Sequence, residues 1–244
     1  MSISFTLDKL YSGAKQNKWL GYFAVFLRIV LAVGFITAGL TKIMGERFAS
    51  GLSANHPMGQ YLVALYHTGY YYTFIGVAQI VAAILLLIPR TVTLGALLYL
   101  PIILNICILS FALRFEGSIL TSPLMVLGDL YLLCWNYDKL KYLLPFDHGV
   151  SANVNSNKKN TSNKFPLKFF SAVLAIIILL VLFINTGYDI MPRNSLKDCN
   201  SQFQGTNRTQ AGSNFCDCIH NQGQPLDSCL KKYYIAPDDA VPAK

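Results

Sequence analysis

The stretch Trp19–Thr41, WLGYFAVFLRIVLAVGFITAGLT, is apolar along its whole length except for Arg28. A helix needs roughly 20 consecutive apolar residues to cross the hydrocarbon core of a bilayer, so this stretch predicts a membrane span. Its apolar part is longer than that of a cleavable signal peptide, and no A-x-A site follows it. We therefore expect it to stay in the protein as a membrane anchor.

Four further segments, all C-terminal to this anchor, are also long and apolar. Asp129 is the one charged residue inside their apolar runs. The composition agrees, because 53% of the residues are hydrophobic and only 13% are charged, whereas soluble domains are usually about 25% charged. We therefore expect an all-α polytopic membrane protein and exclude an ordinary soluble enzyme. The five expected spans are 19–43, 70–89, 92–114, 119–141 and 166–187.

Lysine and arginine are distributed unevenly between the loops on the two sides of these spans. The segments on the side of the N-terminus carry ten Lys and Arg residues, and the loops on the other side carry three. The tail after residue 187 carries six Lys and Arg residues and six aspartates, so its net charge is zero. Cytoplasmic loops carry the positive excess, so we expect a cytoplasmic N-terminus and an outer C-terminal tail. The net charge of +8 then orients the chain in a lipid membrane, and we expect no nucleic-acid partner.

The chain divides by composition into four parts. The linker is rich in Asn, Ser and Lys, which is typical of a flexible connection. The outer loop 44–69 places Tyr61, Leu62 and Leu65 at helical spacing, which predicts a short interfacial helix. The expected parts are a four-helix transmembrane bundle (1–145), a cytoplasmic linker (146–165), a fifth transmembrane helix (166–187) and an extracytoplasmic cysteine-containing tail (188–244).

Four polar side chains fall inside the predicted spans, where burial of polar groups is costly. Counted from the cytoplasmic ends of their helices, Arg28, Gln79 and Asp129 lie at one depth, roughly 15 Å into the membrane. Asn105 lies one turn further out. An ion pair between Arg28 and Asp129, with Gln79 beside it, is therefore expected.

This polar cluster has two interpretations. The pair can be structural and fix the register of the helices. It can also be functional, as a site for the polar headgroup of a ligand such as a quinone carbonyl, or as a proton relay. A third arrangement would turn Arg28 toward a water-filled cavity or another subunit. We assign no catalytic residue from the sequence.

Six cysteines fall into two groups. Cys107 and Cys134 lie in predicted spans and differ by about 18 Å in depth, beyond disulfide reach, so we expect buried thiols. The tail holds Cys199, Cys216, Cys218 and Cys229, which in an oxidising compartment predicts two disulfides.

Four cysteines allow three pairings, and we disfavour the small ring that would join Cys216 to Cys218. In a helix these two side chains point about 200° apart, so one can reach back to Cys199 while the other reaches forward to Cys229. This predicts a small helical hairpin that its core alone could not hold together. A redox relay and a zinc site with His220 are the alternatives, but the ligand spacing is irregular and we expect no metal.

Several short motifs resemble the DoxX-like family. Arg28 and the run Ala38-Gly39-Leu40-Thr41-Lys42 resemble its opening pattern, and Gly76-Val77-Ala78-Gln79, Leu85–Arg90, Gly95 and Asn105 extend the likeness. The likeness covers about residues 18–145 and implies a four-helix integral membrane bundle. Many relatives carry an acid at the position of Gln79, so a carboxylate role is not transferred there.

The resemblance implies a class of function rather than one reaction. Members of the family include subunits linked to quinone-coupled sulfur or thiol oxidation, redox-associated maturation proteins and assembly factors. We therefore expect an accessory subunit in a bacterial inner membrane that docks on other membrane or periplasmic subunits. The alternatives are a membrane subunit of a quinone-linked oxidoreductase, with quinone as the one cofactor implied, and a chaperone for membrane-protein assembly.

Overall fold

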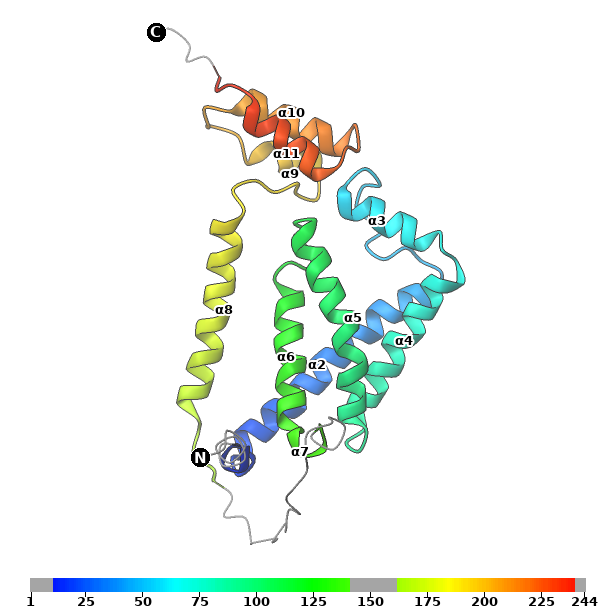
Figure 1. Cartoon of the computed structure of the whole chain (residues 1–244), viewed down its shortest axis with the longest axis vertical. Helices are drawn as coiled ribbons and strands as arrows, with labels where there is room; N and C mark the ends of the chain where they lie inside the picture. Colours follow the sequence, from blue (N-terminus) through cyan, green and yellow to red (C-terminus); the bar gives the residue numbers. More distant parts are fainter. Residues whose placement is uncertain (1–10, 141–161, 240–244) are drawn as a thin grey trace, which may run out of the picture. The chain divides into compact units, whose positions relative to one another are not determined.

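The computed structural model describes residues 11–140 and 162–239. Within these ranges the chain forms helices and turns, and one isolated β-bridge joins Asn17 to Ser162, which confirms the all-α fold class. The expected linker 146–165 lies outside the described residues as far as residue 161. The helices are α2 (Lys18–Ile43), α3 (Pro57–Tyr66), α4 (Tyr70–Leu87), α5 (Val92–Ala112), α6 (Thr121–Trp135), α7 (Tyr137–Leu140), α8 (Leu167–Gly187), α9 (Leu196–Ser201), α10 (Thr209–His220) and α11 (Leu226–Ile235) (Figure 1).

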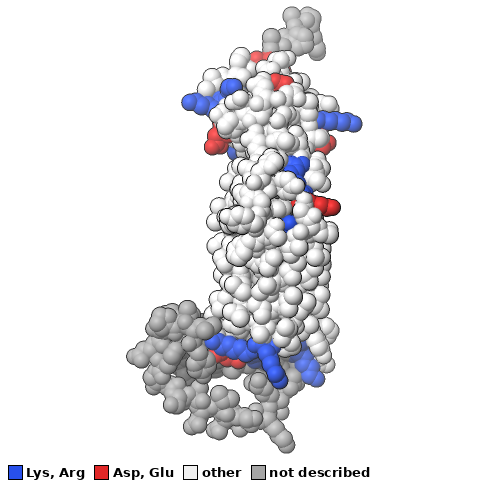
Figure 2. Space-filling model, turned by 90° about the vertical axis from the view of Figure 1, so that its right-hand side faces the viewer, with Lys and Arg blue, Asp and Glu red and all other residues white. Residues whose placement is uncertain are grey.

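Four of these helices, α2, α4, α5 and α8, are long and apolar enough to cross a membrane. The chain is therefore a multi-pass membrane protein. On the face shown in Figure 2, a broad stretch of surface carries no charged side chains, and Lys and Arg gather at one end of that stretch.

The expected span 119–141 is shorter and interrupted, since α6 ends at Trp135 after 15 residues and α7 resumes at Tyr137. The break lies at Asn136, whose side-chain amide donates to the carbonyl of Leu132 at 2.8 Å. The backbone N–H of Asn136 is shared between the carbonyls of Leu132 and Leu133, both at 3.1 Å, which is the three-centre bonding common at helix ends. At about 22 Å, α6 is shorter than the roughly 30 Å hydrocarbon core.

Contacts divide the chain into two compact units, each containing parts of the long helices. Among the described residues, the first unit comprises 11–37, 78–103, 124–140 and 162–179, and the second comprises 38–77, 104–123 and 180–239.

In the first unit, α6 packs antiparallel along α2. A Cβ added to Gly34 would lie 2.9 Å from the terminal carbon of Met125, so this glycine permits the close approach. Further along the pair, the Tyr131 hydroxyl donates to the carbonyl of Leu20 at 3.0 Å. Helices in lipid gain little from burying apolar surface, so close packing of this kind holds them together.

The packing of α4 against α5 in the first unit is closer still. A Cβ on Gly95 would lie 2.6 Å from the backbone nitrogen of Leu86, so only glycine fits there. The ring of Tyr99 stacks on Phe35 with centroids 3.5 Å apart, and its hydroxyl donates to the carbonyl of Leu31 at 3.3 Å. Both rings are fully buried.

In the second unit, the predicted short helix of the outer loop is present as α3. His56 caps it by accepting the backbone N–H of Met58 on Nδ1 at 3.1 Å. Met58 and Leu62 form its buried face and pack with Leu52 and Phe115.

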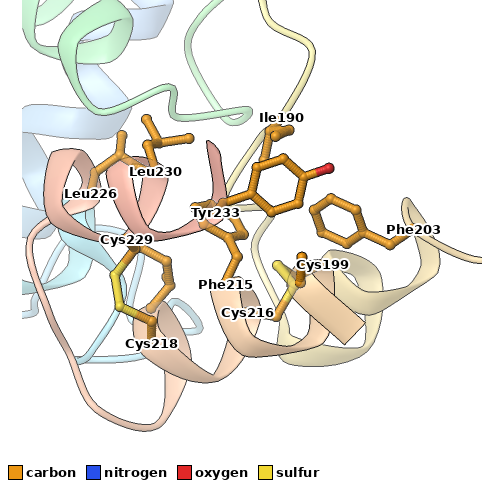
Figure 3. Close-up of a cluster of buried hydrophobic side chains, with 12 residues drawn as sticks. Ile190, Cys199, Phe203, Phe215, Cys216, Cys218, Leu226, Cys229, Leu230 and Tyr233 are labelled. Carbon is orange, nitrogen blue, oxygen red and sulfur yellow. A yellow bond between two sulfur atoms is a disulfide. The ribbon is translucent and has the colours of Figure 1, made fainter. Parts of the chain in front are cut away.

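The tail of the second unit folds as the predicted stapled hairpin. Cys199 bonds to Cys216 and Cys218 to Cys229, which confirms two disulfides and selects the partner of each cysteine. Figure 3 shows both bonds flanking a small core of aromatic and aliphatic side chains. A Cβ on Gly212 would meet the ring of Phe203 at 2.1 Å, so α10 approaches this ring through a glycine.

Candidate functional site: the polar bundle core and the tail contact

Arg28 of α2 is bound to the end of α4. Its Nε donates to the carbonyl of Leu86 at 2.7 Å, and its Nη2 donates to the carbonyl of Leu87 at 2.5 Å. The last carbonyls of a helix have no partner within it and carry the negative end of the helix dipole, so a cation is well placed here.

The predicted ion pair between Arg28 and Asp129 is therefore wrong: no ion pair joins them in the structure, whose described ion pairs lie elsewhere. Counting residues assumed that the guanidinium stays level with its own Cα. Its flexible stem instead carries the charge to exposed carbonyls nearby, as expected for a long cationic side chain in a membrane.

Asp129 and Gln79 are both buried in the first unit. Asp129 on α6 is 0% exposed and Gln79 on α4 is 1% exposed. Neither oxygen of Asp129 has a hydrogen-bond partner among the described residues, and the same holds for Oε1 of Gln79. Tyr99 of α5 lies within electrostatic range of Asp129, but its hydroxyl is committed to Leu31.

Buried oxygens without partners are costly in an apolar medium. An ordered water or the polar group of a ligand would satisfy them, so each of these two residues has the chemistry of a binding site. Tyr99, which the sequence reasoning missed, is the polar residue of α5 within range of Asp129, and its position halfway along an apolar span was the available signal.

Asn105 does not join this group. Its side chain is exposed on α5, in the second unit. The neighbouring Leu104 and Ile108 are exposed as well. The polar amide therefore belongs to an outward helix face rather than to the bundle core.

The tail cysteines are unsuited to thiol exchange in the folded state. The disulfide-bonded residues Cys199, Cys216 and Cys229 are completely buried and Cys218 is nearly so. Attack by a thiolate needs access to a sulfur atom, and a disulfide offers no thiolate to a zinc ion. The geometry favours the structural interpretation over the relay and the metal site.

The tail is bound to the outer loop by side chains that the sequence reasoning did not single out. The amide of Asn55 donates to the carbonyls of His220 at 2.9 Å and Asn221 at 3.2 Å. Gln60 of α3 donates to the carbonyl of Gly223 at 2.6 Å. Gly223 has a φ of +60°, a conformation that favours glycine.

The turn after α5 makes a second contact with the tail. Arg114 donates to the carbonyl of Ile190 at 2.6 Å, and its guanidinium lies 4.9 Å from the ring centroid of Tyr188. Arg193 forms an ion pair with Glu116. These contacts hold the segment after α8 against the second unit's own loops.

Two histidines meet where the tail contacts α3. The ring centroids of His56 and His220 are 6.0 Å apart, and both side chains are buried. Nε2 of His220 lies 2.8 Å from the carbonyl of Pro192 and so donates to it. Burial, together with repulsion from His220, lowers the pKa of His56 from 6.5 to about 4.

These features define a class: a multi-pass helical membrane protein with a buried polar group in its bundle and a disulfide-linked tail bound to its outer loops. The curated Uncharacterized protein YwoB of Bacillus subtilis (strain 168) is 35% identical over 122 residues, which cover 48% of this chain and 77% of YwoB. The chain therefore belongs to the same family as YwoB. No protein-family model matches the chain. No solved structure matches it either.

Proposed function

We propose that the chain is an accessory subunit of a larger complex in the bacterial inner membrane, with its N-terminus in the cytoplasm and its tail in the periplasm. The charge asymmetry of the loops supports this orientation. The resemblance of residues 18–145 to DoxX-like proteins supports the choice of membrane.

The observation that carries the proposal is the outward amide of Asn105. It lies about 20 Å from the start of α5 and about 10 Å from its end, so it falls at the depth of the hydrocarbon core. Lipid chains offer an amide no hydrogen bond, whereas a polar side chain on a neighbouring helix does. A partner helix against this face of α5 would satisfy it.

The test is purification from the native membrane in mild detergent, followed by mass spectrometry of the proteins recovered with the chain. We expect a stoichiometric partner whose recovery falls about five- to tenfold in Asn105→Leu, the effect of one interhelical hydrogen bond. The matched control is Asn185→Leu, because Asn185 lies in the last turns of α8, where water can replace a partner.

Three outcomes would contradict the subunit proposal. The chain could be monomeric with no crosslinked partner in cells. Asn105→Leu and Asn185→Leu could behave alike. A deletion strain could lose one particular membrane protein that never binds stoichiometrically, which would favour an assembly chaperone instead.

A second function, as a membrane subunit in quinone-linked thiol or sulfur oxidation, is favoured by the unpaired oxygens of Asp129 and Gln79. A quinone headgroup bound there would be sensitive to the polar side chains of α4 and α6. We expect quinone that copurifies with the protein to be lost in Asp129→Asn.

The control for this second function is Arg28→Gln, because Arg28 contacts the end of α4 rather than Asp129. The control should weaken the bundle while retaining quinone. Equal quinone content in Asp129→Asn and the unmodified protein would remove this function.

A further inference from the structure

One cavity of the first unit is separate from the polar core. Its volume is about 330 Å³. Among the described residues it is lined mainly by aromatic side chains, namely Tyr11, Tyr131, Trp135, Tyr137 and Phe169, with the thiol-bearing Cys134. Aromatic residues at the end of membrane helices are typical of the level of the lipid headgroups.

The walls of the cavity are mainly apolar, and two of its three tyrosine hydroxyls are already paired. The Tyr131 hydroxyl donates to the carbonyl of Leu20 at 3.0 Å, and the Tyr11 hydroxyl donates to the carboxylate of Asp138 at 2.7 Å. The part of a ligand inside the cavity must therefore be mainly apolar.

The edge of the cavity carries positive charge. Nζ of Lys15 lies 4.5 Å from the ring centroid of Trp135 and 5.4 Å from that of Tyr11. Hydrogen bonds between the backbones of Lys18 and Ser162, at 3.2 Å, and from Asn17 to the carbonyl of Lys164, at 2.9 Å, hold the start of α8 beside the start of α2.

The segments that line or adjoin the cavity are rich in lysine. Residues 11–19, 136–140 and 162–169 contain five lysines and one acid, Asp138, which already accepts the Tyr11 hydroxyl. Apolar walls below such an edge complement a molecule with a hydrocarbon chain and a negatively charged headgroup.

We propose that this cavity binds an anionic phospholipid, with part of one acyl chain among the aromatic residues and the phosphate among the lysines. Lys15 and Lys18 are the residues that distinguish an anionic from a zwitterionic headgroup. This site does not depend on the proposed function, because it uses neither Asn105 nor the polar bundle core.

The expectation of a buried thiol is confirmed for Cys107 and wrong for Cys134, which is exposed and lines the cavity. Cys134 therefore gives a direct readout. The experiment measures the rate at which N-ethylmaleimide labels Cys134 in detergent-purified Cys107→Ala protein. Mixed micelles contain phosphatidylglycerol or phosphatidylcholine with identical acyl chains. We expect phosphatidylglycerol to slow labelling at about tenfold lower concentration, because each lysine near a phosphate strengthens binding several-fold.

Two pairs of variants test the two halves of the site. Lys15→Gln with Lys18→Gln should abolish the preference for phosphatidylglycerol, whereas Lys231→Gln with Lys232→Gln, on α11, should preserve it. Ala14→Phe should fill the cavity and make labelling independent of lipid, whereas Gln16→Phe, at an exposed neighbouring position, should not. If Ala14→Phe fails to fold, the lysine variants still decide the proposal.

Equal protection by the two lipids would overturn the proposal, because the headgroup would then have no effect. Absence of protection by either lipid would also overturn it. Protection by an uncharged quinone but not by phosphatidylglycerol would assign the cavity to a different ligand and likewise overturn it.

Discussion

The bundle core of the first unit and the tail of the second unit differ in whether their polar groups have hydrogen-bond partners. The bundle buries Gln79, Thr93 and Asp129 with unpaired atoms among aliphatic side chains. In the tail, backbone carbonyls of His220 and Ile190 accept hydrogen bonds from Asn55 and Arg114 of the outer loops, and two disulfides close its small core. Among the buried polar atoms of the tail, Oδ1 of Asn200 has no partner among the described residues.

The difference follows from the surroundings of each region. Helices in lipid associate through close packing, which Gly95 and Gly34 permit, and unpaired polar groups persist there mainly for function. A tail of three short helices faces water and has too small a core to be stable by itself. Its stability must come from covalent links and hydrogen bonds.

Reduction of the disulfides should produce the largest difference in stability between the tail and the bundle. The two bonds close loops of 17 and 11 residues, and each contributes about 3 kcal/mol. We expect reductant to unfold the tail while the bundle stays intact. Limited trypsin digestion with mass spectrometry should show cleavage after Lys231 and Lys232 in reduced protein only. Equal protection of the reduced tail would show that loop contacts are sufficient.

Acid should weaken the tail contact next most strongly. Because the folded-state pKa of His56 is about 4, below its ordinary 6.5, the unfolded form takes up the proton first. The contribution of His56 to the free energy of unfolding is therefore fully present above pH 6.5. About 3 kcal/mol of it is lost as the pH drops toward 4. Hydrogen exchange of α3 and α10 should rise over this interval.

The control for the acid effect is a change at another histidine of the same loop. His56→Gln should flatten the pH dependence, whereas His67→Gln, at an exposed position, should leave it unchanged. A pH profile identical in all three proteins would assign the effect to other groups.

Close packing in the outer part of the bundle should be sensitive to a single methyl group. A Cβ on Gly76 would lie 2.8 Å from the carbonyl oxygen of Gly39, so Gly76→Ala should destabilise the protein by about 2 kcal/mol. Gly21→Ala is the control, since its Cβ would meet only Trp135 at 3.7 Å. Thermal unfolding in detergent measures both, and similar midpoints would contradict the close contact.

The smallest effect is expected for one polar contact of the tail. Asn55→Ala removes donors to His220 and Asn221 and should cost about 1 kcal/mol. Hydrogen exchange of α10 measures the change. Asn214→Ala, on an exposed part of α10, should have less effect, and the reverse order would show that Asn55 does not secure the tail.

Much of the fold follows from local pattern in the sequence. Apolar length predicted the helices that span the membrane, and the helical spacing of Cys216 and Cys218 predicted two disulfides directed to opposite sides. The prediction of an ion pair between Arg28 and Asp129 was wrong because residue counting gives the depth of a Cα but not the direction of a long side chain. The end of α6 at Asn136 is a matter of local hydrogen bonds, shared between two carbonyls, which periodicity does not show.

The tail contact could not be predicted because it joins distant residues. Asn55 and His220 are 165 positions apart, and neither belongs to a motif. Nothing in the sequence indicates that His56 and His220 lie side by side, with ring centroids 6.0 Å apart. Asp129 and Gln79 were singled out correctly as costly polar residues, but Tyr99 resembled ordinary core.

The order of the disulfides along the chain has a consequence for biosynthesis. Each bond joins neighbours in the series of tail cysteines, the first to the second and the third to the fourth. In the proposed orientation the tail crosses the membrane from its start, so Cys199 meets Cys216 before Cys229 arrives. An oxidase that simply links cysteines as they emerge would produce the native pairs, and the tail would mature without a disulfide isomerase.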